Sequence, residues 1–168
     1  MRIRWTKADR SGKPDALACF RDDGTTTYTR LSPFFPLHDL LHYAVETTLD
    51  YRTAFWGLIE QGWDLGSFAE KNPETGRLAR ELPAQALLAE NLVGFLQLAA
   101  TGSVSSDPDD LYHFLSAQWD PIPNEISPGS LAIIHSRFAE LMQRWQRLSP
   151  GGAMELYFPA SLRARGED

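Results

Sequence analysis

The chain has 168 residues, with the hydrophobic (43%) and charged (23%) fractions of an ordinary globular protein and a formal net charge of −6. This acidic balance argues against nucleic-acid binding, which needs a basic surface, and no apolar run approaches the roughly 20 residues of a membrane span. The single cysteine, Cys19, excludes an internal disulfide, and the N-terminus has no apolar signal-like run, so we expect a cytoplasmic protein of a bacterium-like cell.

Strand patterns lie at both ends of the chain. MRIRWTKA alternates apolar and polar residues, which places Met1, Ile3 and Trp5 on one face of a half-buried strand. ALACF and TTYTRL are the next two strand candidates, and Asp23-Gly24 between them predicts a hairpin with a type I′ turn. MELYF, after the Gly-Gly pair near the C-terminal end, predicts a last strand that returns to the N-terminal ones.

Helical periodicity fills the middle of the chain. A first helix is predicted from Pro36 to about Gly62, because proline suits a first turn and the apolar residues then repeat at helical spacing. Three more helices are predicted over residues 83–100, 107–119 and 130–148, the second of which starts at the capping sequence SDPDD.

Strands at both ends with helices between them predict an α+β fold. We expect a small antiparallel sheet of three or four strands, packed against about four helices. A chain of this length typically forms one domain. We expect that domain to span residues 1–162, followed by a disordered tail over residues 163–168.

The motif HDLLH, residues 38–42, places two histidines near the start of the first predicted helix. Side chains at this spacing lie one turn apart, so His38 and His42 could together bind zinc or another divalent metal. His38 would lie in the first turn, where the positive end of the helix dipole disfavours a protonated ring and favours the neutral imidazole that a metal requires. At about 100° per residue, the two histidines border the apolar stripe, and Asp39 and Glu46 lie one step further toward water.

HDLLH partly resembles the zincin motif H-E-x-x-H, in which the glutamate is the general base for a metal-bound water. Asp39 occupies that position and is one methylene shorter. Its reach is therefore shorter by about an ångström, whereas a catalytic hydrogen bond must span about 2.6–3.2 Å. Asp39 and Glu46 are the two candidates for activating the water. The motif differs from the zincin pattern at Asp39, the position of the zincin general base.

Glu46 is eight residues beyond His38, or about 12 Å along a straight helix, so one metal would not contact both. It could instead accept a hydrogen bond from His42 and support that ring. A third metal ligand must come from another element. The candidates are His113, His135 and acids such as Glu90 or Glu140. We expect the third ligand to come from the helix that carries His135 or from the helix that carries His113.

The run DGTTTYTRLSPFFPLHDLLHYAVETTLDYRTAFWGLIEQGWD, residues 23–64, resembles a family of small uncharacterised bacterial proteins. In that family a hairpin leads into a helix that opens with P-x-H-D-L-x-H-x-x-V-E. The resemblance implies that His38, Asp39, His42 and Glu46 belong to the defining pattern of the family. It implies no assigned activity.

These features predict a polar site formed by histidines and acids. If the protein is an enzyme, metal-assisted hydrolysis fits the site best. The alternative is a non-enzymatic binding or regulatory module, in which the same residues form a structural hydrogen-bond network. The expected partner is a small molecule or a protein, with no nucleic acid and no membrane, and the sequence gives no oligomeric state. Ionisable groups gathered in a concave pocket would favour the enzyme.

Overall fold

The computed structural model describes residues 1–10, 12–31, 35–74 and 78–158. Within these residues the chain forms the predicted α+β fold, with one four-stranded antiparallel sheet and five α-helices. The tail predicted over residues 163–168 lies outside the described residues.

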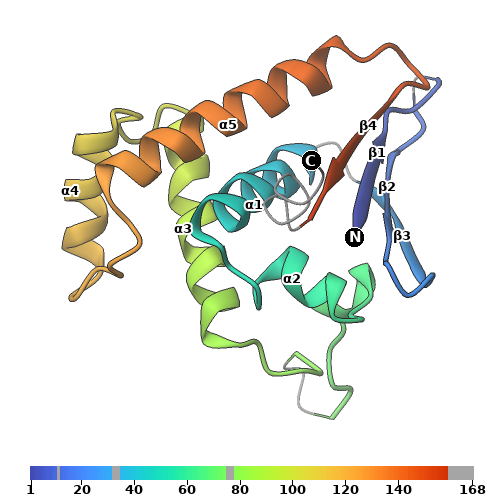
Figure 1. Cartoon of the computed structure of the whole chain (residues 1–168), viewed down its shortest axis with the longest axis horizontal. Coiled ribbons are helices and arrows are strands. Elements are labelled where there is room, and N and C mark those ends of the chain that lie inside the picture. Colours follow the sequence, from blue (N-terminus) through green and yellow to red (C-terminus); the bar gives the residue numbers. More distant parts are fainter. Residues whose placement is uncertain (11, 32–34, 75–77, 159–168) are drawn as a thin grey trace, which may run out of the picture.

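The sheet is built from both ends of the chain (Figure 1). Its strands are β1 (Arg2–Thr6), β2 (Asp15–Phe20), β3 (Thr26–Leu31) and β4 (Ala153–Tyr157). Their order is β3-β2-β1-β4, so the C-terminal strand pairs with the N-terminal one, as predicted. In the register of β1 and β2, Ile3 lies opposite Cys19 and Trp5 lies opposite Leu17. These four side chains are buried on one face of the sheet. Burial raises the pKa of the Cys19 thiol to about 12, so Cys19 acts as a small apolar core residue.

The turn between β2 and β3 differs from the predicted type I′ geometry. Gly24 has a φ of 85°, whereas Asp23 is not among the residues with positive φ. The Gly24 amide donates to the Arg21 carbonyl at 3.1 Å, and the Arg21 amide donates to the Thr25 carbonyl at 2.9 Å. This is a type I turn followed by a glycine bulge, which requires positive φ at one residue only.

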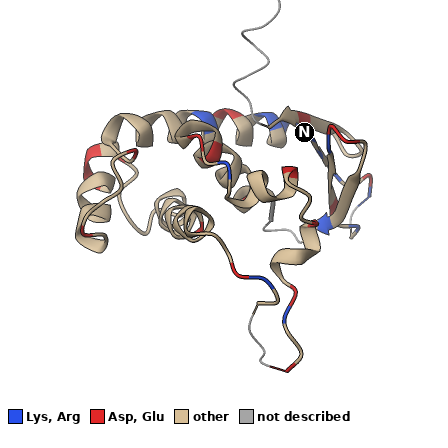
Figure 2. Cartoon of the chain, turned by 60° about the horizontal axis from the view of Figure 1, so that its bottom comes forward, with Lys and Arg blue, Asp and Glu red and all other residues tan. Residues whose placement is uncertain are grey.

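Five α-helices and one short 3₁₀ helix make up the rest of the described structure. They are α1 (Phe35–Leu49), α2 (Phe55–Glu60), η1 (Leu65–Phe68), α3 (Ala84–Ala100), α4 (Pro108–Gln118) and α5 (Pro128–Arg147). Helix α1 is central: α3 and α5 both pack against it, and Tyr43 of α1 meets Trp5 of the sheet edge-on, with 6.5 Å between ring centroids. In the orientation of Figure 2, the positions of lysines and arginines are dispersed along the ribbon among those of acidic residues. The described helices include none that is both long and apolar enough to cross a lipid bilayer.

The single helix predicted from Pro36 to about Gly62 is wrong, because the structure has two helices there. Helix α1 ends at Leu49, Asp50 takes a left-handed φ of 56°, and the Tyr51 amide donates to the Glu46 carbonyl at 3.0 Å. This closing bond is typical of a left-handed helix terminus. No glycine or proline marks the position, so the apolar periodicity continues across the break. The break allows α2 to start close to the middle of α1.

Gly57 is where α2 passes closest to this turn. A Cβ atom at Gly57 would lie 2.1 Å from the carbonyl oxygen of Arg52, so only glycine fits without displacing the backbone. We expect Gly57→Ala to lower the free energy of unfolding by about 1–3 kcal/mol, the usual cost of overpacking. Urea denaturation measures this value. Gly94→Ala in α3 is the matched control, because a Cβ there meets nothing within 4 Å. Equal responses of the two variants would contradict the steric explanation.

Candidate functional site

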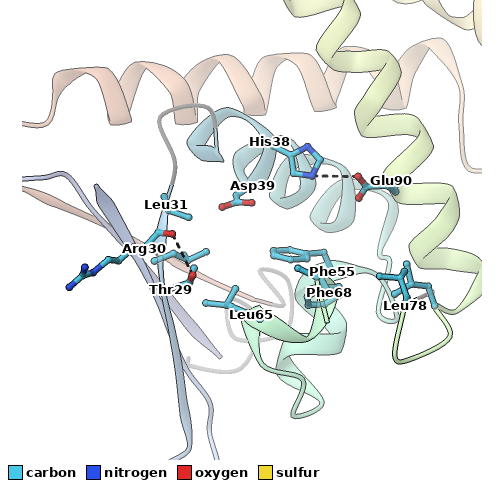
Figure 3. A pocket seen from close by; sticks show the side chains of 14 residues that line it. Thr29, Arg30, Leu31, His38, Asp39, Phe55, Leu65, Phe68, Leu78 and Glu90 are labelled. Carbon is cyan, nitrogen blue, oxygen red and sulfur yellow. Dashed lines mark hydrogen bonds and ion pairs between the residues drawn. The ribbon is translucent and has the colours of Figure 1, made fainter. Parts of the chain in front are cut away.

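Helices α1 and α3 bring two histidines and one glutamate together. His38, His42 and Glu90 each offer a nitrogen or oxygen ligand atom, and these atoms all lie within 4.8 Å of one another. The Nε2 atom of His42 is 3.0 Å from Glu90 Oε2, and the Nε2 atom of His38 is 3.6 Å from Glu90 Oε1. Figure 3 shows the His38 ring facing the Glu90 carboxylate across the gap between the helices. The two histidine nitrogens thus converge on a third ligand, which is the geometry that a metal site requires.

The third member of this cluster is Glu90, and neither His113 nor His135 joins it. Both of those histidines are exposed, on α4 and α5. Helix α5 does pack against α1, but on another face, where Arg137 donates hydrogen bonds to the hydroxyl groups of Thr47 and Thr48. Within the described part of the chain, His38, His42 and Glu90 are the one group of histidines and acids close enough to hold a metal ion.

Glu46 connects His42 to the start of α2. Its Oε1 atom lies 3.2 Å from His42 Nδ1, as the spacing of the two residues predicts. Its Oε2 atom accepts hydrogen bonds from the backbone amides of Trp56, at 2.9 Å, and Gly57, at 3.4 Å. Both oxygens therefore have partners, and the side chain is buried. This geometry favours a supporting role for Glu46, in which it orients the His42 ring, over direct contact with a substrate.

The two acids of α1 do not lie toward water, contrary to the prediction from the helical wheel. Asp39 is 3% exposed and Glu46 is 1% exposed. The start of α2 covers this face of α1. Phe55 contacts the His42 ring, with 5.3 Å between centroids, and the Trp56 indole N–H donates to the Asp39 carbonyl at 3.3 Å. A helical wheel describes one helix alone, so it cannot predict that a second element, here α2, buries the polar side of α1.

The charges in the cluster are coupled. Burial lowers the pKa of the His42 imidazole, but hydrogen bonds and charges from Glu46 and Glu90 outweigh burial and raise this pKa to about 9. Burial, followed by the charge of His42, lowers the pKa of His38, which favours its neutral ring. The hydrogen bond from His42 lowers the pKa of Glu90. Burial raises the pKa of the Glu46 carboxyl, while its three donors favour the ionised form.

A cavity of about 530 Å³ opens beside the cluster, and His38, Asp39 and Glu90 line it. Figure 3 shows the Asp39 carboxylate between the sheet and His38, on the cavity side of α1. The Oδ2 atom of Asp39 is buried and has no hydrogen-bond partner. Burial is the main cause that raises the pKa of this carboxyl to about 7, with opposing effects from His42, which lowers it, and Glu90, which raises it. A buried acid with an unpaired oxygen is rare in folded proteins, and acids with strongly shifted pKa values beside a cavity concentrate at functional sites.

The site must be interpreted from its own geometry, because the chain matches no family model, no curated protein and no solved structure. The resemblance of residues 23–64 to a bacterial family therefore stays a prediction.

Proposed function

We propose that this protein is a metal-dependent hydrolase whose metal ion is held by His38, His42 and Glu90. The observation that carries the proposal is the convergence of three ligand atoms from two helices, within 4.8 Å of one another, at the wall of a cavity. Two histidines and one carboxylate form a ligand set found in catalytic zinc enzymes, which leaves a further coordination position open.

Each polar residue then has a distinct role. A divalent metal bound here would act as a Lewis acid toward a substrate carbonyl. Asp39 would take a proton from the attacking water, since this residue lines the same cavity as His38 and Glu90. Glu46 would be a positioning residue: by accepting from His42 Nδ1, it directs Nε2 of that ring toward Glu90 and the metal.

A second candidate function is a binding module in which the cluster is purely structural. The two nitrogens of His42 lie 3.2 Å and 3.0 Å from two carboxylates, distances at which a protonated ring donates to both. Such a ring would join α1, α2 and α3 without a metal.

Metal stoichiometry separates the two functions. Protein purified without a histidine tag and dialysed against zinc is expected to hold about one zinc ion per chain, since the three ligands form a single site. Zinc is measured by mass spectrometry. The substitutions His38→Ala and Glu90→Gln are expected to abolish binding, because each removes a ligand. The controls His113→Ala and Glu140→Gln change exposed residues of α4 and α5 and should keep full stoichiometry.

Cobalt provides a second measurement, because a four-coordinate cobalt site absorbs visible light. Loss of this band in His38→Ala and Glu90→Gln, with retention in both controls, would support the metal site. A chain that holds no zinc and no cobalt, or that loses none in these variants, would overturn the hydrolase proposal in favour of the structural network.

A further inference from the structure

The cavity beside the cluster is polar at one end only. Its remaining wall is mostly apolar and comes from the sheet, from α2 and η1, and from the segment before α3. The main apolar side chains are Leu17, Leu31, Phe55, Leu65, Phe68 and Leu82. Figure 3 shows Phe55, Phe68 and Leu65 on the far side of the cavity from Asp39 and His38. A cavity of about 530 Å³ is in the range of small-molecule sites.

The charges around the cavity would disfavour an anion. Asp39 and Glu90 are acids that line it. Arg30 also lines it, but its side chain is exposed and Figure 3 shows the guanidinium extending away from the cavity. Among the described lining residues, Arg30 is the only lysine or arginine. In the metal-free protein, a carboxylate or phosphate inside the cavity would therefore meet two acids, with no lysine or arginine of the lining directed at it.

Resting on the hydrolase function proposed above, we infer that the substrate is an uncharged ester or amide with an apolar acyl group. The acyl chain fills the cavity against Leu65 and Phe68, and the carbonyl group lies at the polar end beside His38 and Asp39. This placement buries apolar surface on both partners. It also brings a polar group of the substrate to the end of the cavity that His38 and Asp39 line.

The reaction is a hydrolysis without redox change. The water oxygen forms a new bond to the acyl carbon, and the bond from that carbon to the leaving oxygen or nitrogen breaks. One proton of the water passes through Asp39 to the leaving group. The other stays on the new carboxylic acid, which loses it to solvent.

The inference is tested on the metal-free protein, so that its outcome does not depend on metal binding. Acetamide, butyramide and hexanamide are titrated against ¹⁵N-labelled full-length protein, and affinity is read from amide chemical shifts. Each added methylene is expected to raise affinity about fourfold, so hexanamide should bind about 200-fold more tightly than acetamide. Hexanoate, with the same chain and a negative charge, is expected to bind at least about tenfold more weakly than hexanamide.

Two variants test where the apolar acyl chain binds. Phe68→Ala removes part of the cavity wall and should reduce the gain in affinity that each added methylene of the amide gives. Leu87→Ala, an exposed residue of α3 outside the cavity lining, should leave it unchanged. Equal affinity along the amide series, equal binding of hexanoate and hexanamide, or an unchanged series in Phe68→Ala would overturn the inference. None of these results would alter the zinc stoichiometry, so failure here is distinct from failure of the hydrolase proposal.

Discussion

Replacement of Glu46 by alanine is expected to lower the free energy of unfolding by about 3–5 kcal/mol, the usual cost of breaking a buried ion pair. The variant leaves His42 buried with one of its two carboxylate partners removed, and it removes the acceptor for the amides of Trp56 and Gly57. A domain of ordinary stability has about 5–15 kcal/mol in total. The transition in urea, followed by circular dichroism, should therefore move to a much lower concentration.

Glu46→Gln removes the charge of this side chain and keeps its shape, so it distinguishes the two contributions. The amide oxygen still accepts one hydrogen bond, so the loss of stability should be smaller than for alanine. Zinc affinity should fall about 10- to 100-fold, as is typical when the partner of a histidine ligand is weakened. Glu140→Gln, on the exposed side of α5, is the control and should stay within about 0.5 kcal/mol. Wild-type stability of Glu46→Ala would show that Glu46 does not hold α1 and α2 together.

Asp39→Asn is expected to lower kcat of the zinc-loaded protein about 10²- to 10⁴-fold, the range for loss of a general acid or base. The assay substrate is p-nitrophenyl hexanoate, whose leaving group needs no proton, so the loss reports on Asp39 as the base for water. Asparagine has nearly the same shape as aspartate. The cavity wall, the melting temperature and the zinc content are therefore expected to change little.

Asp109→Asn in α4 is the control for this substitution, because Asp109 is exposed in the first turn of that helix. Its kcat should remain within about twofold of the original, as expected for a surface change. If Asp39→Asn also kept its kcat, Asp39 would have no part in the chemistry, even with the zinc site intact.

Local patterns were sufficient to predict most of the fold. Period-two alternation identified β1, and turn and glycine signals bounded the other three strands. Helical periodicity, together with the capping sequence SDPDD of α4, placed α3, α4 and α5 within a few residues. The division between α1 and α2 could not be predicted, because it depends on a left-handed Asp50 rather than on a glycine or proline. The hairpin was predicted at the correct place with the wrong turn type, since Asp23-Gly24 suits more than one tight turn.

The candidate site was predictable only along one helix. The bond between His42 and Glu46 follows from their spacing of four residues, and it forms as predicted. Glu90 is 48 residues beyond His42, and nothing in its own segment distinguishes it from other acids on helices. Its approach depends on how α3 packs against α1. The burial of Asp39 likewise depends on α2, so tertiary packing decides which acids meet the histidines.

Glu90 is the one member of the cluster that α1 does not supply, and this has a kinetic consequence for α3. Proteins open locally, and helices with few buried contacts open most readily. With an ion bound, Glu90 would tie the first half of α3 to α1, so this half could separate only after the ion left. The residence time of the ion would then limit how often α3 opens and how quickly the wall of the cavity that it borders can rearrange.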